Sequence, residues 1–283
     1  LRKLESLALV SRKLASSSQR GERRSSRAGS GIAFATHRAY APGDDFRFVD
    51  WKAFARSEQL YVKQYEQERA LAVHLLLDCS SSMAHDEGAK FRYAKQLAAA
   101  LGYIALVNLD SVSVQPYAGL PRARLAPLRG RNRALILLHF LAALTAHGTT
   151  DLPAAAKSVA AHAASGGLSF VLSDGFDGAS LLEGVDRLRI AALAPVVLLL
   201  TDRRDAEPTL RGELSLVDSE SGETRTLRID ERALTRYRAA YRLRLDQLRA
   251  ALAQRRVPAV ELGVEVPLER AVLGLLRRGG IVA

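Results

Sequence analysis

The chain has 283 residues, which is long for one domain but short for two full ones. Hydrophobic residues make up 48% of it and aromatic residues only 6%, so we expect a sizeable core built from Ala, Leu and Val. The formal net charge of +11 points to an acidic partner, nucleic acid or an anionic membrane surface. No run of Arg and Lys is interleaved with aromatic residues, which disfavours a nucleic-acid platform.

Cysteine usage and hydropathy narrow the class further. Cys79 is the single cysteine, which excludes a disulfide within the chain and a thiolate metal cluster and indicates a reducing compartment. No apolar run reaches the roughly 18 residues of a membrane span, and the N-terminus lacks the apolar stretch of a signal peptide. We therefore expect a cytoplasmic protein without a transmembrane segment.

The first 70 residues divide into two parts of different character. Residues 1–30 are predicted to form a short helix, up to Ala15, followed by a flexible basic linker rich in Ser, Arg and Gly. Residues 31–70 are predicted to be rich in β-structure, because apolar residues such as Phe46 and Phe48 alternate with polar ones.

From residue 71 to 283, short apolar strands alternate with helices. This alternation predicts βαβ units and an α/β fold with a doubly wound, mostly parallel sheet. The strands lack an apolar–polar alternation, as expected where helices cover both faces of a sheet. The expected strands are Val73–Leu77, Val112–Tyr117, Leu168–Leu172, Val196–Leu200 and Ala259–Leu262. The expected helices are Phe91–Leu109, Arg133–Thr145, Asp151–Ala164, Leu181–Ile190, Glu231–Arg256 and Leu268–Arg278.

A β-hairpin is predicted to interrupt this pattern at about residues 211–230. Two short apolar runs lie on either side of the turn sequence Ser219–Gly222. Since this hairpin and the segment 31–70 both carry unpaired strand edges, we expect them to join in one β-layer.

Oxygen-bearing side chains follow the ends of several predicted elements. Asp78, Ser80 and Ser82 come directly after a buried strand, Thr150 precedes a helix, and Asp174 follows another strand. The carboxyl ends of parallel strands meet at one edge of a sheet, where ligands bind. Carboxylate and hydroxyl oxygens suit Mg²⁺, with Mn²⁺ or Ca²⁺ as alternatives. The three segments together predict one cation site.

Two resemblances sharpen this prediction. Asp78–Met83, Gly148–Leu152 and Leu172–Gly175 together resemble the metal-ion-dependent adhesion site of von Willebrand factor type A domains. Tyr40–Trp51 and Tyr61–Arg69 resemble the signature of the bacterial family called domain of unknown function 58. The signature residues are Gly43, Asp44, Asp45, Arg47, Asp50, Trp51 and Arg56. The implied metal ligands are Asp78, Ser80, Ser82, Thr150 and Asp174, with Thr149 and Asp151 as alternatives to Thr150.

The family resemblance also implies a function. Members are typically encoded beside MoxR-type AAA+ ATPases and are thought to assist them in chaperone-like remodelling or cofactor insertion. We therefore expect a non-catalytic, metal-dependent adaptor that binds such an ATPase or its client and has no small-molecule substrate. A P-loop and a Gly-x-Ser-x-Gly elbow are both absent from the sequence. The alternatives are a metal-dependent hydrolase, with Asp177 or His147 as base, and a nucleic-acid binder that uses the basic arm.

The signature segment has no role that the resemblance assigns. Gly43 suits a tight turn, and we expect the acidic residues there to pair with Arg47 and Arg56. Trp51 is expected to bury a large apolar area. A structural clamp between this segment and the α/β domain is the preferred hypothesis, and a partner-recognition surface is the alternative.

Overall fold

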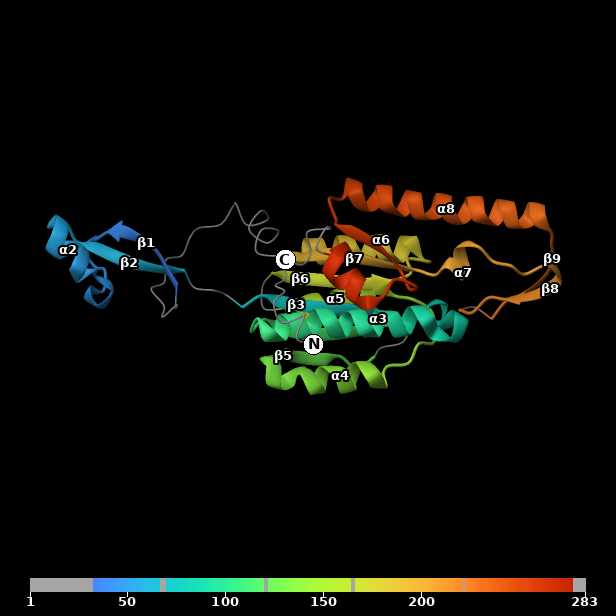
Figure 1. Ribbon diagram of the computed structural model, residues 1–283, viewed down its shortest axis with the longest axis horizontal. Coiled ribbons are helices and arrows are strands. Elements are labelled where there is room, and N and C mark those ends of the chain that lie inside the picture. The colour runs from blue at the N-terminus through green and yellow to red at the C-terminus, as the bar shows by residue number, and fades with distance from the viewer. Residues whose placement is uncertain (1–32, 67–69, 120–121, 164–165, 221, 277–283) are drawn as a thin grey trace. The chain divides into compact units, whose positions relative to one another are not determined.

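The computed structural model describes residues 33–66, 70–119, 122–163, 166–220 and 222–276 (Figure 1). The predicted N-terminal helix and basic linker lie outside these residues. The chain divides into two compact units between Ala70 and Leu71. No helix in the described ranges is both long enough and apolar enough to cross a membrane.

The smaller unit is an antiparallel strand pair with helical turns inserted between the strands. β1 (Ala33–Ala39) pairs with β2 (Tyr61–Glu66), and the inserted turns are η2 (Phe46–Phe48) and α2 (Trp51–Ser57). The strand predicted from Phe46 and Phe48 is therefore wrong. Asp45 accepts the backbone N–H of Arg47, and Asp50 accepts those of Lys52 and Ala53. These local side-chain caps turn the chain into helical geometry despite its alternating pattern.

The larger unit is built on a six-stranded sheet with strand order β10-β7-β6-β3-β4-β5. All neighbouring strands are parallel except β4 and β5, which confirms the predicted α/β class with a mostly parallel sheet. The strands are β3 (Ala72–Asp78), β4 (Ser111–Tyr117), β5 (Leu125–Arg129), β6 (Gly167–Ser173), β7 (Leu193–Thr201) and β10 (Ala259–Gly263). The sequence did not predict β5, because this short edge strand contains Pro127 and its residues are only partly buried or exposed.

Helices cover both faces of the sheet (Figure 1). Leu75 and Leu77 face a core shared with α3 (Ser81–Val107), α4 (Ala134–Ala143) and η4 (Ala271–Leu276). Leu76, between them, faces a second core shared with α5 (Leu152–His162), α6 (Gly178–Ile190) and α8 (Glu231–Gln254). The remaining short elements are η3 (Arg131–Arg133), α7 (Arg203–Ala206) and α9 (Leu268–Arg270). Burial on both faces explains why these strands read as continuous apolar runs.

Two helix boundaries differ from the prediction. α3 begins at Ser81, ten residues before the predicted start at Phe91, because its first turns follow directly from the strand end and are rich in polar residues. The last predicted helix is α-helical only over Leu268–Arg270 and then continues as a π-helix.

The predicted hairpin is present as β8 (Gly212–Val217) and β9 (Thr224–Ile229). These strands pair with each other, and β1 pairs with β2, so these four strands form two separate two-stranded sheets. The joint β-layer stays a prediction. In Figure 1 the hairpin lies at the end of the larger unit where the parallel strands finish.

A glycine in α6 allows the start of α5 to approach closely. A Cβ added at Gly184 would lie 2.4 Å from Cγ of Leu152. We expect Gly184→Val to lower the free energy of unfolding by about 1–3 kcal/mol, since overpacking forces the neighbouring helix to move. Urea denaturation measures this. Gly178→Ala in the same helix is the control, because its Cβ would approach Leu248 only to 3.7 Å. Equal loss of stability in the two variants would contradict the close-packing argument.

Candidate metal centre

Three loops meet at the carboxyl edge of the sheet. β3 and β6 are parallel neighbours, so Asp78 at the end of β3 and Asp174 just after β6 emerge side by side. The loop before α5 is tied to the first of these loops. The backbone N–H of Ser81 donates to Gly148 O at 2.8 Å, and the N–H of Gly148 donates to Ser81 Oγ at 2.9 Å. The topology thus brings all three predicted segments to one place.

Asp78 lies at the centre of this edge and is only 2% exposed. Its Oδ1 accepts the N–H of Ser80 at 3.0 Å. Its Oδ2 accepts the hydroxyl of Ser173 at 2.6 Å and, at 3.5 Å, that of Thr150. Burial, and next the charge of Asp174, raises the pKa of Asp78 to about 6. The carboxylate is therefore held by neutral donors in a place that disfavours its charge.

Asp174 is held by a buried lysine of α3. Lys90 Nζ lies 2.8 Å from Oδ2 of Asp174 and 2.8 Å from Oδ2 of Asp205. Burial alone would lower the pKa of Lys90, but the two carboxylates outweigh this effect and raise it. Oδ1 of Asp174 accepts the N–H of Phe176 at 3.1 Å. Lys90 therefore stays charged and is shared between two acids.

The structure brings the five predicted oxygen-bearing residues to this edge. The hydroxyls of Ser80 and Ser82 lie 3.0 Å apart. Of the three candidates in the loop before α5, Thr150 turns its hydroxyl to Asp78. Asp151 instead caps α5 through the N–H of Ala154, and Thr149 bonds Gly119 through its backbone carbonyl.

Four further residues at this edge were missed by the sequence reasoning. Ser173 lies inside a recognised motif, so its hydroxyl could have been suspected as a partner of Asp78. Lys90 and Asp205 lie in parts of helices outside the recognised motifs, and no sequence signal marks them. Glu220 lies in the predicted hairpin turn, is half-buried and lines a cavity together with Ser82 and Lys90.

The chemistry of these residues fits a hard divalent cation. The described residues contain no group of three or more His, Cys, Asp and Glu arranged for a metal, so hydroxyls have to complete the ligand set. Asp78 and Asp174 would supply two carboxylates, and Ser80, Ser82 and Thr150 three hydroxyls. Magnesium accepts such a mixture together with waters. The hydrogen-bond partners of Asp78 within the described residues are neutral. A bound cation would therefore stabilise the charged carboxylate and lower its raised pKa.

The other reactive side chains of these loops are placed less favourably for chemistry. Cys79 is fully buried, and burial raises the pKa of its thiol to about 12, as expected for a small core residue. His147 is exposed and lies 3.5 Å from the hydroxyl of Thr145. Asp177 caps α6 by accepting the N–H of Ser180 at 3.0 Å.

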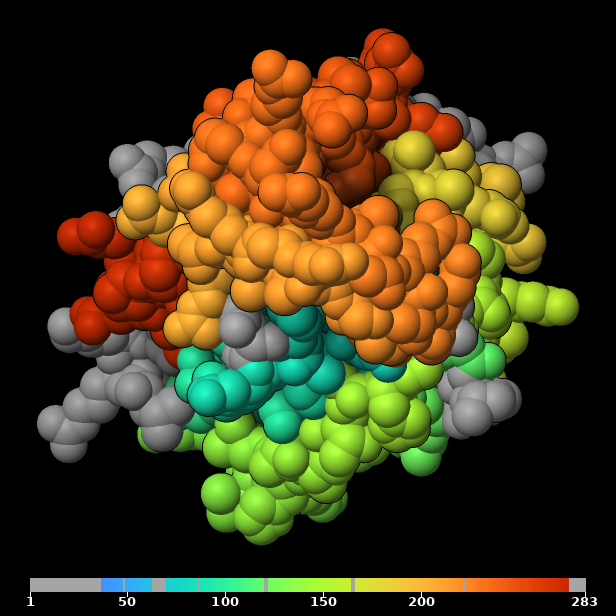
Figure 2. Space-filling model, turned by 90° about the vertical axis from the view of Figure 1, so that its right-hand side faces the viewer, coloured from blue at the N-terminus to red at the C-terminus, as the bar shows by residue number. Residues whose placement is uncertain are grey.

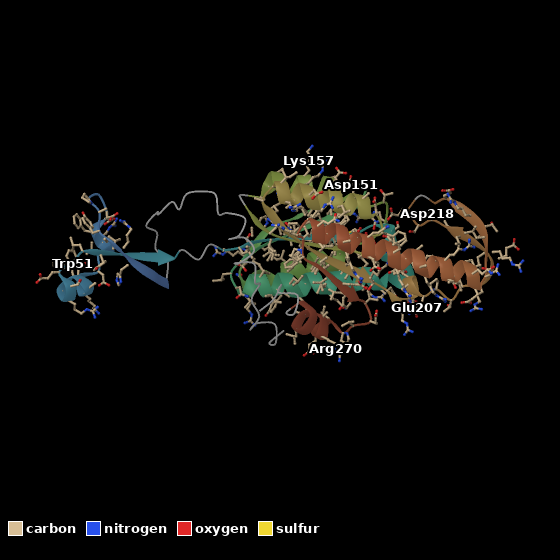
Figure 3. The ribbon with its side chains drawn as sticks, turned by 90° about the horizontal axis from the view of Figure 1, so that it is seen from above. Trp51, Asp151, Lys157, Glu207, Asp218 and Arg270 are labelled. Carbon is tan, nitrogen blue, oxygen red and sulfur yellow. The ribbon has the colours of Figure 1, made fainter. Side chains whose placement is uncertain are left out.

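A cavity of about 560 Å³ lies at this edge, and of the five candidate ligands Ser82 lines it. One side is formed by Ser82, Lys90 and Phe176 at the sheet edge, and the other by the hairpin turn from Val217 to Glu220. Figure 2 looks onto this end of the unit, where the light-orange hairpin lies between α8 and the teal start of α3. Figure 3 shows Lys157 of α5, Asp151 at its start and Asp218 in the hairpin turn in that order along one side.

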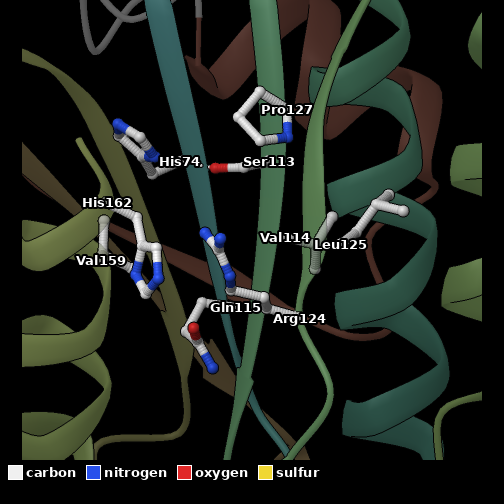
Figure 4. Close-up of a pocket in the computed structure, with 9 residues that line it drawn as sticks. All are labelled: His74, Ser113, Val114, Gln115, Arg124, Leu125, Pro127, Val159 and His162. Atoms are coloured by element: carbon white, nitrogen blue, oxygen red, sulfur yellow. Dashed lines mark hydrogen bonds between the residues drawn. The ribbon is translucent and has the colours of Figure 1, made fainter. Parts of the chain in front are cut away.

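A second cavity lies on the side of β4 and is too small for a ligand. Its volume of about 20 Å³ matches a single water. It is lined by nine residues, among them His74, Ser113 and His162 (Figure 4). Burial lowers the pKa of His74 to about 4, so its ring is neutral at pH 7.

The acidic residues of the signature segment have local partners in the smaller unit. Asp45 pairs with Arg47 at 2.6 Å, as predicted. Asp44 pairs instead with Arg38 at 2.7 Å, and Asp50 with His37 at 2.8 Å.

Three other signature residues give mixed outcomes. Arg56 donates to the backbone carbonyl of Lys52 at 3.2 Å, and its predicted pairing with an acid stays a prediction. Trp51 is 58% exposed within the smaller unit, where its ring meets the edge of the Phe54 ring. Its predicted burial of a large apolar area stays a prediction. Gly43 has φ +104°, which fits the expected turn. The clamp between the two units stays a prediction.

Comparisons with known proteins agree on a family without an assigned activity. The family model described as "Protein of unknown function DUF58" matches residues 36–249. Uncharacterized protein Rv1480 of Mycobacterium tuberculosis is 29% identical over 225 residues, which is 77% of this chain and 67% of that protein. Uncharacterized protein YeaD of Bacillus subtilis is 45% identical over 53 residues, which is 19% of this chain and 13% of that protein.

Two solved structures have a similar fold. One is the conserved hypothetical protein BatB from Bacteroides thetaiotaomicron, with a TM-score of 0.43 and 14% identity. That match covers 74% of this chain and 98% of BatB. The other is the SpRpn10 VWA domain, with a TM-score of 0.39 and 12% identity, which covers 72% of this chain and 94% of that domain.

Proposed function

Because this chain belongs to the DUF58 family, whose function is unknown, we propose a role from the site itself: a metal-dependent, protein-binding adaptor. The observation that carries this proposal is a pair of buried carboxylates, Asp78 and Asp174, at a sheet edge where Ser82 and Lys90 line a cavity. Mg²⁺, or Mn²⁺ or Ca²⁺ in its place, would be held by Asp78, Ser80, Ser82, Thr150 and Asp174. When bound, the cation would offer an open coordination position, and a carboxylate of a partner would occupy it.

Binding is favoured over catalysis by the placement of the candidate bases. A hydrolase of this kind needs a general base beside the metal-bound water. Asp177 is engaged in capping α6, and His147 is exposed beside Thr145. His147 is not among the residues that line the cavity, and the Asp177 carboxylate that does line it already accepts a backbone N–H. The residues of the site are therefore better suited to ligating a partner than to turnover.

The partner proposed is a MoxR-type AAA+ ATPase or its client protein, in chaperone-like remodelling or cofactor insertion. The resemblance of the signature segment supports the class of partner. The formal net charge of +11 on this chain supports a partner whose contact surface is acidic. Arg232, Arg236 and Arg242 are exposed along α8. Such charges raise the rate of association with an acidic surface more than they fix the final complex.

The test separates these two contributions by surface plasmon resonance against a purified MoxR-type ATPase. EDTA or Asp174→Asn is expected to raise the dissociation rate by about tenfold, which corresponds to about 1.4 kcal/mol. Raising the salt concentration is expected to lower the association rate, since the Debye length falls to about 8 Å at physiological ionic strength. Asp186→Asn, in the last turns of α6 where Asp186 pairs with Arg255, is the control.

The proposal fails if the complex dissociates at the same rate with chelator, with Asp174→Asn and in untreated protein. A steep loss of binding to DNA or RNA with salt, without any dependence on metal, would favour the basic arm as the functional element instead.

A further inference from the structure

An apolar face of α4 stays exposed in the part of the chain that the structure describes. The helix lies on the outer side of the larger unit next to β5 (Figure 1), and His139 is the one polar residue in its sequence. Leu137 and Leu141 are buried in the core beneath it. The exposed apolar residues of α4 are Leu135, Ile136, Leu138, Ala142 and Ala143. A helix that is apolar on all sides is normally buried, so we expect this outer face to have a partner.

The beginning of the sequence carries an apolar stripe of matching length. Leu4, Leu7, Ala8 and Leu14 recur at helical spacing, and the helix predicted up to Ala15 lies outside the described residues. Leu4 and Leu14 would be about 15 Å apart along a helix, which is also about the length of α4. An isolated helix of this size is marginally stable in water. The segment therefore needs an apolar surface to pack against, and α4 offers one.

The chain enters the six-stranded sheet close to the start of α4. Ala72 of β3, Ser111 of β4 and Arg129 of β5 are partners in one row across the sheet. Arg129 is about 10 Å from Ala72, since neighbouring strands lie about 4.8 Å apart. The helix α4 begins shortly after Arg129, at Ala134. The polypeptide that precedes β3 therefore leaves the sheet near the N-terminal end of α4.

The chain between this point and the N-terminal segment is long enough to return to α4. Ala33 pairs with Glu66 at the open end of the β1–β2 pair. The stretch from Glu66 to Leu71 spans at most about 18 Å when extended. Residues 16–32 are rich in Ser, Arg and Gly and span up to about 55 Å when extended. The predicted helix can therefore reach the outer face of α4 without any demand on the placement of the smaller unit.

We propose that residues 1–15 form an amphipathic helix that docks on the outer face of α4. Its apolar stripe covers Leu135, Ile136 and Leu138. A tethered segment has an effective concentration in the millimolar range, well above that of a second chain in dilute solution. The chain's own segment therefore occupies this face in preference to another copy and keeps it from associating with other molecules. The inference is independent of the proposed metal centre, because no candidate ligand takes part in it.

The experiment measures how fast a maleimide labels a cysteine on α4 in the whole chain. Leu135 is 67% exposed within the described residues, and Leu135→Cys places a thiol on the outer face. Cys79 is fully buried and does not compete for the reagent. Leu243→Cys is the matched control, because Leu243 is 57% exposed on α8, which packs on the opposite face of the sheet. We expect Leu135→Cys to react about tenfold more slowly than Leu243→Cys, since its thiol is reached only when the docked helix opens.

Substitutions in the N-terminal segment identify what covers α4. Leu7→Gln combined with Leu14→Gln interrupts the apolar stripe, and we expect this pair to bring the labelling of Leu135→Cys up to the rate of Leu243→Cys. Leu9→Gln is the control, because Leu9 lies on the opposite side of the predicted helix, two positions after Leu7. This control is expected to leave Leu135→Cys protected.

Equal labelling of Leu135→Cys and Leu243→Cys in the otherwise unchanged chain means that the face is uncovered and the proposal is wrong. If Leu135→Cys then becomes protected on addition of anionic phospholipid vesicles, the face belongs to a membrane surface instead. Protection that persists when Leu7 and Leu14 are both replaced also contradicts the proposal. In that case, protection that grows with protein concentration assigns the face to a second copy, and protection that does not assigns it to another part of this chain.

Discussion

Asp78→Ala is expected to lower the affinity for Mg²⁺ and Mn²⁺ by more than about 100-fold. Losing a residue that only orients a metal ligand costs about 10–100-fold, and Asp78 would be a ligand itself. Asp78 also orients its neighbours, since its two carboxylate oxygens accept hydrogen bonds from Ser80, Ser173 and Thr150. Calorimetry with either cation measures the loss directly.

A second readout of the same variant uses stability. A ligand present at 100 times its Kd stabilises a folded protein by about 2.7 kcal/mol. Thermal unfolding of wild type should therefore shift upward with Mg²⁺, and that of Asp78→Ala should not. Asp186→Ala is the control, because Asp186 pairs with Arg189 and Arg255 outside the candidate site. An equal Mg²⁺-dependent shift in wild type and Asp78→Ala would show that the cation binds elsewhere.

The fold class could be predicted from the sequence because burial leaves a direct trace in it. Leu75, Leu76 and Leu77 are all fully buried, which only a strand covered on both faces permits. Helices between such strands imply parallel pairing, and parallel pairing brings Asp78 and Asp174 to one edge. The candidate site therefore follows from local pattern and topology together, without knowledge of the strand order.

The features that sequence reasoning missed depend on tertiary contacts or on local competition. The caps formed by Asp45 and Asp50 override the alternating pattern around Phe46 and Phe48. Lys90 meets Asp174 across 84 residues of sequence, and a lysine in a helix carries no sign of such a partner. Glu220 is recognisable as a turn residue, but its partial burial depends on where the hairpin packs.

Lys90→Met is expected to lower the free energy of unfolding in EDTA by about 3–5 kcal/mol, since removing one partner of a buried ion pair leaves uncompensated charge. The side chain of Lys90 is 3% exposed, and those of Asp174 and Asp205 are 5% and 14% exposed. Methionine keeps the unbranched stem but removes the ammonium. Lys95→Met in the same helix is the control, because the contacts of Lys95 among the described residues are Leu144 O and the Phe91 ring, neither of them acidic. Urea denaturation measures both variants.

The same variant tests whether Lys90 and the cation serve the same carboxylates. If they do, Mg²⁺ replaces the missing positive charge and stabilises Lys90→Met more than it stabilises wild type. By linkage, the stability that Lys90→Met loses in EDTA is then recovered when metal binds, so the variant binds Mg²⁺ more tightly than wild type. The reason is that the ammonium no longer competes for Asp174. Lys90→Gln provides a less severe version should the methionine variant fail to fold in EDTA. Equal stabilisation of wild type and both variants by Mg²⁺ would mean that Lys90 supports the fold alone and does not tune the metal centre.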